Sequence, residues 1–237
     1  HVWGFGEHAR ATFRLTSCEL GGERSSITVR MAGRELPVTV GAPGRHMVQN
    51  ALAVLGASYL AGADMEKVAA ALATFEAERG RGRRHHLAHP SGGEIVVIDE
   101  SYNANPASMR AALGLLGTTP VPPGGRRIAV LGDMLELGEH SAKLHAGLAA
   151  PLAEAQVDIT LLGGAEMAAL AASLPPEARA AHRDGAEALK PLLLDTVRPG
   201  DVIMVKSSNS AGFSRLVEAL LREFPAAGGA ARQAAEV

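Results

Sequence analysis

The sequence has very little cysteine, few aromatic residues and no excess of charge of one sign. Its one cysteine, Cys18, excludes an intramolecular disulfide and a metal cluster built from cysteines. The net charge of −2 leaves no electrostatic footprint for nucleic acid or an anionic membrane. Aromatic residues are only 3% of the chain, so we expect alanine and leucine to fill the core.

Long apolar runs and targeting signals are also missing. No segment is apolar over the length that a bilayer requires, because even the alanine-rich stretches carry frequent charges. The chain starts at His1, and no signal-peptide pattern follows. We therefore expect a cytoplasmic protein without nucleic-acid or membrane partners, and a chain that is a processed or truncated piece of something longer.

Three common cofactor signatures are absent. Neither Gly132 nor the pair at 163–164 supplies the G-x-G-x-x-G spacing of a dinucleotide-binding turn, and no Walker A sequence occurs. The nine histidines show no metal-ligand spacing, and we interpret His85, His86 and His89 as part of a solvated linker. The sequence thus predicts neither a nicotinamide-dependent dehydrogenase nor metal ligands within this chain.

What the chain does contain is a change of pattern near residue 94. Alternation over 10–40 predicts antiparallel strands, followed by helices at about 47–60 and 65–76. Residues 77–93, rich in glycine, arginine and histidine, indicate a linker and a hairpin turn. The later segment predicts strands at 94–98, 127–131, 158–162, 201–205 and near 180–183, with helices at 106–116, 140–155, 165–173, 186–195 and 211–223. This alternation predicts a doubly wound, mainly parallel α/β sheet.

The segment 99–106, Asp-Glu-Ser-Tyr-Asn-Ala-Asn-Pro, lies where the first of these strands ends and a helix begins. In an open parallel sheet, strand carboxyl ends and helix amino ends expose backbone groups to one crevice, where ligands bind. A helix cap accounts for Asn105 and Pro106. It leaves four polar residues unexplained and so favours a binding role: Asp99, Glu100, Tyr102 and Asn103.

Two further strand ends carry polar loops. The segment 132–138 contains Asp133 and Glu136, and the segment 206–210 opens with Lys206 beside the start of a helix. A cation next to free helix N–H groups suits a carboxylate or a phosphate. Taken singly, each loop is as readily a solvated turn or a helix cap. Three such loops on one edge of a sheet indicate a binding crevice.

Together these segments resemble the Mur ligases, a family of ATP-dependent ligases. The motifs occur in the family's order and span nearly the whole chain: 44–53, 80–82, 99–109, 130–138 with His145 downstream, and 205–208. We expect His145 itself to be packed rather than catalytic. The Tyr-Asn-Ala-Asn-Pro and Gly-Asp-Met-x-Glu-Leu-Gly segments resemble the branch that adds a dipeptide rather than a single amino acid.

The resemblance implies three domains: one that binds a UDP-sugar, a central ATPase domain and a C-terminal Rossmann-like domain. Residues 1–86 match the C-terminal part of the central domain, and residues 87–225 match the complete Rossmann-like domain. The tail 226–237 is expected to be disordered. The P-loop, the magnesium ligands and the modified lysine of the family would precede His1, so we expect the chain alone to be inactive.

The resemblance also implies a reaction. ATP phosphorylates the terminal carboxylate of a UDP-N-acetylmuramoyl-tripeptide, and the amine of D-Ala-D-Ala attacks the acyl phosphate, which extends a peptidoglycan precursor for cell-wall synthesis. Such chemistry needs cations around the phosphoryl group and exclusion of water. ATP and Mg²⁺ are the expected cofactors, these small molecules are the expected partners, and we expect a monomer.

The same resemblance assigns candidate roles to nucleotide-binding positions. Asn50 matches the residue that contacts adenine, and His46 matches one near the nucleotide. Arg81 matches the linker arginine that reaches the phosphates, with Arg83 as the competing alignment. Glu100 matches the acid that holds the ribose.

The dipeptide and the phosphates are expected at the three polar loops, against Asn103, Asn105, Asp133, Glu136, Lys206 and Ser208. Arg81 and Lys206 are the expected catalytic residues. Two departures from the family stand out. Met47 replaces a frequent asparagine, and Ser207 replaces the glycine of Lys-Gly-Ser. A serine at positive φ would cost roughly 1 kcal/mol, so we expect a different turn there.

Two other interpretations of the sequence stay open. The first is another member of the superfamily, either a ligase that adds a single amino acid or folylpolyglutamate synthase. The Tyr-Asn-Ala-Asn-Pro segment argues against it. The second is a stand-alone module that binds a nucleotide or a peptide, which the missing P-loop favours if His1 is a true start.

Overall fold

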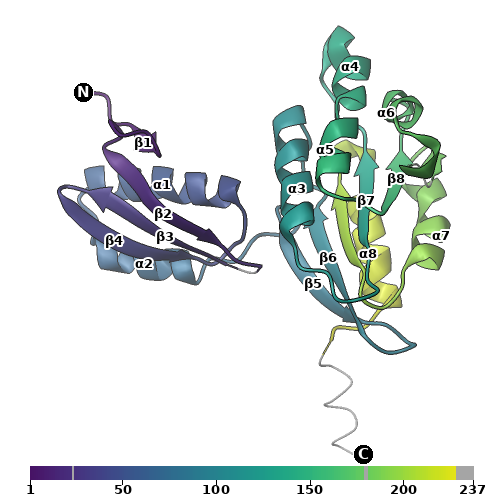
Figure 1. Cartoon of the computed structure of the whole chain (residues 1–237), viewed down its shortest axis with the longest axis horizontal. Coiled ribbons are helices and arrows are strands. Elements are labelled where there is room, and N and C mark those ends of the chain that lie inside the picture. The colour runs from purple at the N-terminus through teal and green to yellow at the C-terminus, as the bar shows by residue number, and fades with distance from the viewer. Residues whose placement is uncertain (23, 179–180, 228–237) are drawn as a thin grey trace, which may run out of the picture. The chain divides into compact units, whose positions relative to one another are not determined.

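The computed structural model describes residues 1–22, 24–178 and 181–227 (Figure 1). The chain divides into two compact units, His1–Ala77 and Glu78–Val237. Most of the tail that was expected to be disordered, residues 228–237, lies outside the described residues. Within the described ranges, no helix is long and apolar enough to cross a membrane.

The first unit packs one sheet against two helices. The strands are β1 (Phe5–Gly6), β2 (Phe13–Leu20), β3 (Ser25–Met31) and β4 (Arg34–Val40), in that spatial order. The pairs β2–β3 and β3–β4 are antiparallel, as predicted, and the short β1 pairs with β2 in parallel. Alternate residues of β3, including Ile27 and Val29, are buried against α1 (Arg45–Leu60) and α2 (Met65–Ala73). The Asp64 carboxylate caps α2 by accepting from the Glu66 and Lys67 N–H groups.

The second unit is built on a sheet of six strands, in the order β5-β6-β10-β7-β8-β9. The strands are β5 (Arg83–Ala88), β6 (Glu94–Glu100), β7 (Arg127–Gly132), β8 (Ile159–Gly163), β9 (Ala181–Arg183) and β10 (Val202–Lys206). Among the strands that the described residues form, β5 alone is antiparallel to its neighbour. The mainly parallel sheet predicted from the strand–helix alternation is thereby confirmed.

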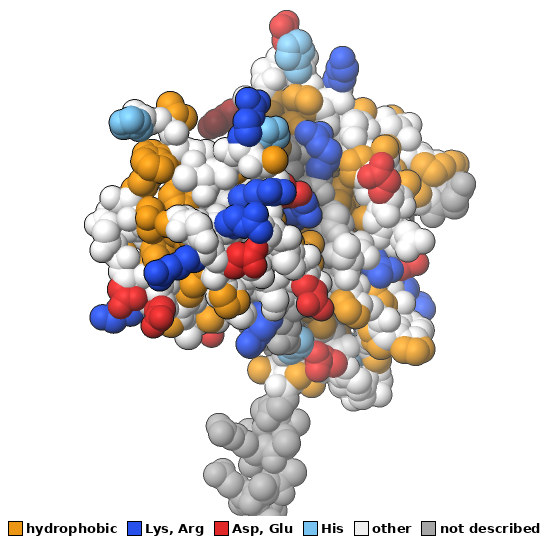
Figure 2. All heavy atoms as spheres, turned by 60° about the vertical axis from the view of Figure 1, so that its left-hand side comes forward, with side chains coloured by type: hydrophobic (Ala, Val, Ile, Leu, Met, Phe, Trp, Pro, Cys, Tyr) orange, Lys and Arg blue, Asp and Glu red, His pale blue; other side chains and the backbone are white. Residues whose placement is uncertain are grey.

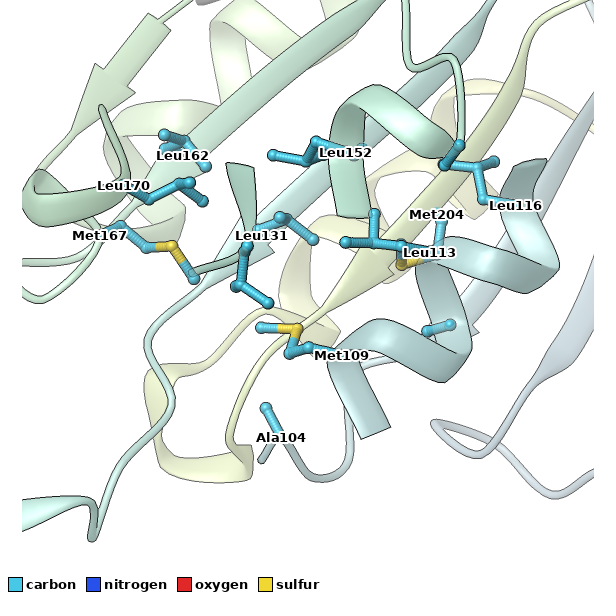
Figure 3. Close-up of a cluster of buried hydrophobic side chains, with 14 of the residues drawn as sticks. Ala104, Met109, Leu113, Leu116, Leu131, Leu152, Leu162, Met167, Leu170 and Met204 are labelled. Carbon is cyan, nitrogen blue, oxygen red and sulfur yellow. The ribbon is translucent and has the colours of Figure 1, made fainter. Parts of the chain in front are cut away.

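Helices cover both faces of this sheet, as expected of a doubly wound fold (Figure 1). They are α3 (Pro106–Thr118), α4 (Ser141–Ala146), α5 (Ala149–Glu154), α6 (Ala168–Ser173), α7 (Ala186–Thr196) and α8 (Ser214–Glu223). One core lies beneath α3, α5 and α6, where Met109, Leu131 and Leu162 meet (Figure 3). The second core joins α7 and α8 to the opposite face through residues such as Leu189 and Phe213. Aliphatic side chains supply most of both cores.

Two predicted elements differ from those observed. The helix predicted at 140–155 is interrupted, and α4 ends before Gly147. Pro151 has no N–H to donate to the carbonyl of Gly147, so a continuous helix would lose that bond. The linker predicted to contain His85 and His86 instead forms β5, an edge strand paired along its length with β6. Its side chains do not alternate cleanly between buried and exposed, so the sequence carried no strand signal there.

Strand β10 comes last in the sequence but lies between β6 and β7. At its amino end, the Arg126 guanidinium donates to both Asp201 carboxylate oxygens, with Nε–Oδ1 and Nη2–Oδ2 distances of 3.0 and 2.6 Å. Arg126 also donates to the Thr196 carbonyl. The Asp201 side chain is fully buried, and its hydrogen bond raises the pKa of Arg126. This pair fixes the position at which β10 enters the sheet.

We predict that Asp201→Ala lowers the free energy of unfolding by about 2–4 kcal/mol, because it leaves the partly buried Arg126 without its carboxylate. Denaturation by urea measures this change. The exposed Asp195, replaced by alanine, is the control and should change the free energy of unfolding by less than about 0.5 kcal/mol. Equal effects of the two substitutions would show that the Arg126–Asp201 pair does not stabilise the sheet.

Candidate active site

The three polar loops identified in the sequence leave adjacent strands. Lys206, at the end of β10, is in register with Glu100 of β6 on one side and with Leu131 of β7 on the other. The carboxyl ends of these parallel strands therefore lie next to one another. The insertion of β10 between β6 and β7 creates this arrangement, which sequence order alone does not reveal.

Asp99 is fully buried, and it binds backbone rather than facing outward. Its carboxylate accepts hydrogen bonds from the Gly80 N–H at 2.8 Å, from the Ser101 N–H at 3.2 Å and from the Ser101 hydroxyl at 2.6 Å. A buried carboxylate requires several such donors to offset the loss of hydration. Asp99 thus joins the segment before β5 to the loop after β6.

Lys206 is also buried, with 2% of its surface exposed. Its ammonium group donates to the Asn103 carbonyl at 2.8 Å and to the Glu100 carboxylate at 3.2 Å. The Glu100 side chain is itself only 12% exposed. The pair therefore fixes the loop after β6 from its neighbouring strand. In this arrangement Lys206 is covered, and a direct contact with substrate stays a prediction.

The start of α3 accounts for Asn105. Its side-chain oxygen accepts from the Ser108 N–H at 2.8 Å, and the Ser108 hydroxyl accepts from the Asn105 N–H at 3.0 Å. This is a capping box, with Pro106 at the first helical position. The helix-cap interpretation of Asn105 is therefore confirmed. Asn103 is exposed, and its side-chain oxygen accepts from the Ala104 N–H.

The loop after β7 is bound on both sides. Asp133 accepts from the Met167 N–H at 3.0 Å through its carboxylate, and its carbonyl accepts from the Ser208 N–H. The Ser208 hydroxyl accepts from the Leu135 N–H at 2.9 Å, which ties the loops after β7 and β10 together. Glu136 is exposed and has a positive φ of 64°. Of the four acids in these loops, Glu136 is the one left on the surface.

His145 is hydrogen-bonded to the loop after β7. It is fully buried, and its Nε2 atom accepts a hydrogen bond from the Met134 N–H at 2.9 Å. A backbone N–H can only donate, so the ring proton lies on Nδ1, which is 2.8 Å from the Ser141 carbonyl oxygen. The neutral ring thus joins α4 to the Gly-Asp-Met segment. As expected, His145 is packed; its hydrogen bond to Met134 could not be predicted from the sequence.

The arginine candidates lie before and within β5. The Arg81 guanidinium carbon is 4.1 Å from the centre of the Tyr102 ring, and the Arg81 side chain is 55% exposed. Arg83 is exposed on the edge strand, where it is in register with Asp99. The geometry brings Arg81, but not Arg83, onto an aromatic residue of the loop after β6.

The two nucleotide candidates of the first unit, His46 and Asn50, lie on α1. Asn50 is exposed and lines a pocket of about 400 Å³, whose walls are mostly apolar. The remaining lining residues are Val40, Met47, Ala51, Val54, Ser58, Val68, Ala71, Leu72 and Phe75. Met47, one of the two departures from the family pattern, thus contributes to the apolar wall. An apolar pocket with one amide at its edge suits a flat heteroaromatic ring.

The remaining features of the site are its surface charge and its potential metal ligands. Lys and Arg side chains are interspersed with Asp and Glu on the face drawn in Figure 2, in keeping with the small net charge. In the described part of the chain, no group of three or more His, Cys, Asp or Glu residues is placed to hold a metal ion.

Comparison with known sequences identifies the class of protein. Residues 80–209 match the family described as Mur ligase, glutamate ligase domain. This match covers more than half of the chain, and the chain belongs to the Mur ligase family.

Among curated relatives, the UDP-N-acetylmuramoyl-tripeptide–D-alanyl-D-alanine ligase of Synechocystis is 32% identical over 216 residues, which cover 90% of this chain and 45% of the relative. The ligase of the same name from Escherichia coli is 30% identical over 220 residues, which cover 92% and 47%. The chain spans about half the length of the curated relatives it matches.

Solved structures agree with this assignment. A crystal structure of MurF from Acinetobacter baumannii superposes with a TM-score of 0.79 at 25% identity, over 92% of this chain and 46% of that one. The MurF ligase of Thermotoga maritima in complex with ADP gives a TM-score of 0.75 at 21% identity, over 92% and 48%. At 21% identity, the match to the Thermotoga maritima structure supports the fold alone.

We predict that His145→Ala lowers the free energy of unfolding by about 2–4 kcal/mol, because it opens a cavity and leaves the Met134 N–H without an acceptor. Chemical denaturation measures this loss. His140, whose side chain is 72% exposed, is the matched control, and its replacement by alanine should cost less than about 0.5 kcal/mol. A loss below 1 kcal/mol at His145 would contradict its role in supporting the loop.

Proposed function

We propose that this chain is part of an ATP-dependent ligase that adds D-Ala-D-Ala to a UDP-N-acetylmuramoyl-tripeptide in peptidoglycan precursor synthesis. One observation carries the proposal beyond family membership: the Tyr-Asn-Ala-Asn-Pro and Gly-Asp-Met-x-Glu-Leu-Gly loops follow strands separated only by β10, and Ser208 after β10 binds the second loop. The names of the relatives in Synechocystis and Escherichia coli support the same reaction.

The proposal assigns the first unit, His1–Ala77, to the end of the central ATPase domain. The second unit, from Glu78 to about residue 225, is assigned to the C-terminal domain, because β5 pairs with β6 of that unit. The sequence contains no Walker A motif, and the relatives are about twice as long. We propose that the remaining part of the protein supplies the P-loop and the magnesium ligands, and that this chain alone does not catalyse the reaction. A cytoplasmic location, a monomeric state and a role in cell shape and division belong to the same proposal.

The adenine ring of ATP is assigned to the pocket on α1. Its apolar walls would cover the faces of the ring, while the exposed Asn50 amide can both donate to and accept from the ring edge. His46, at the start of α1, is assigned a place near the nucleotide. Glu100 remains the candidate for the ribose, although its carboxylate also binds Lys206. ATP supplies the phosphoryl group that activates the tripeptide carboxylate.

Arg81 is the proposed catalytic cation of this chain. Negative charge moves onto the transferring phosphoryl group and then onto the leaving phosphate, and a guanidinium group can hold two of its oxygens at once. The Arg81 side chain is more than half exposed, so such a contact requires no rearrangement of a buried group. Arg83, exposed on β5, is the competing candidate.

The incoming dipeptide is assigned to the loops after β6, β7 and β10. Its ammonium group suits the exposed Glu136 carboxylate, and its carboxylate suits the amino end of α3 beside Asn103. Lys206, Ser208, Asp133 and Asn105 hold these loops in place through the contacts described above. Lys206 also remains a proposed catalytic residue beside Arg81.

The test uses the full-length protein with ATP, magnesium, a UDP-muramoyl-tripeptide and D-Ala-D-Ala. We expect phosphate release that requires both the tripeptide and the dipeptide, and a product enlarged by two alanines in mass spectrometry. Single amino acids replace D-Ala-D-Ala as competing amines, and folate with glutamate replaces both substrates. Phosphate release with one of these, and none with D-Ala-D-Ala, would overturn the proposal in favour of a relative with another substrate.

We predict that Arg81→Ala in the full-length enzyme lowers kcat by about 10²- to 10³-fold, the usual effect of removing one transition-state donor. Arg83→Ala should change kcat by less than about threefold, because an exposed side chain on an edge strand is easily replaced. Steady-state kinetics at saturating ATP measure both. The opposite order of effects would transfer the phosphate-binding role to Arg83.

A further inference from the structure

The segment 78–82 is attached to the loop after β6 by its backbone. The Gly80 N–H donates to the Asp99 carboxylate, the Tyr102 N–H donates to the Gly80 carbonyl at 3.1 Å, and the Gly82 N–H donates to the Asp99 carbonyl at 2.8 Å. Three hydrogen bonds over three residues are typical of a folded strand end rather than a free linker.

Close packing reinforces this attachment. Gly80 has a φ of +75°, and a Cβ atom at this position would lie 2.8 Å from the Tyr102 Cβ atom. Only glycine combines this backbone conformation with so short an approach. The backbone before Arg81 therefore lies directly against the residue on which the Arg81 side chain stacks.

The stacking leaves Arg81 free to bind an anion. The guanidinium carbon lies 4.1 Å from the Tyr102 ring centre, which is the arrangement of a cation–π contact. A guanidinium group is planar, so one that stacks on a ring keeps its N–H donors available along its own edge. The nearest acid, Glu78, is 79% exposed and its carboxylate is 4.0 Å from the Arg81 Nε atom, so this ion pair is weak.

We propose that Tyr102 is a positioning residue for Arg81. The ring holds the guanidinium group in one orientation, from which its N–H edge binds an oxygen of the transferring phosphoryl group. The three backbone hydrogen bonds fix the ring and the arginine relative to each other, so Arg81 moves with the second unit. The proposal rests on the proposed ligase function. It also assigns a role to Tyr102, which the helix cap of α3 left unexplained.

A double-mutant cycle in the full-length enzyme tests this proposal. Tyr102→Leu should lower kcat about three- to fivefold, as expected for loss of an exposed cation–π contact, while Tyr102→Phe, which keeps the ring, should stay within about twofold of the wild type. In an Arg81→Ala background, Tyr102→Leu should change kcat by less than about 1.5-fold, because the group that it positions is gone.

Tyr59 is the matched control, as the other tyrosine of the chain. Its ring meets Phe13 edge-on. Tyr59→Leu should have the same effect on kcat with and without Arg81, because its ring packs on Phe13 within the first unit and does not position the guanidinium group. If Tyr102→Leu also acts equally in both backgrounds, the positioning proposal is wrong, whereas D-Ala-D-Ala-dependent phosphate release by the wild type would still stand.

A measurement independent of activity accompanies the cycle. In full-length protein labelled only at arginine, the Hδ protons of Arg81 should be shifted upfield by the Tyr102 ring current. The shift should persist in Tyr102→Phe and disappear in Tyr102→Leu. An unshifted Arg81 resonance in the wild type would overturn the proposal whatever the substrate of the enzyme. Absence of ligase activity together with the shift would refute the function alone.

Discussion

The candidate site depends on one buried carboxylate, that of Asp99. It lies at the end of β6 and receives three hydrogen bonds, from Gly80 on one side and from Ser101 on the other. A charge at this depth is stable only while these donors are present, and the donors are satisfied only while the carboxylate is there. The segment that carries Arg81 and the loop that carries Tyr102 are therefore ordered together.

Strand β10 has a comparable constraint at each of its ends. Arg126 pairs with Asp201 just before the strand begins, and Lys206 pairs with Glu100 where it ends. A slip in register would leave these buried charges without partners, a cost that apolar packing alone would not impose. Strand β10 is the last of these strands in the sequence and lies between β6 and β7. A register error in β10 would therefore displace the loops that follow all three strands.

Much of this architecture could be predicted from the sequence, because hydrophobic periodicity reports burial directly. It predicted the five parallel strands of the second unit, and the cap residues Asn105 and Pro106 marked a helix start. Contacts between distant residues could not be read in this way. Asp99 and Gly80 are separated by 19 positions, and β5 forms through pairing rather than pattern. Ser207 is not among the described residues with positive φ, consistent with the different turn expected there.

The most direct test of the account is amide hydrogen exchange in the full-length protein, followed at Gly80. If Asp99 joins the segment before β5 to the sheet, the Gly80 N–H should be protected to the same degree as the Val97 N–H of β6, which faces the edge strand β5, because both open only when the edge of the sheet opens. Exchange at the rate of an unstructured peptide, with Val97 still protected, would show that Arg81 lies on a free linker and would contradict the account.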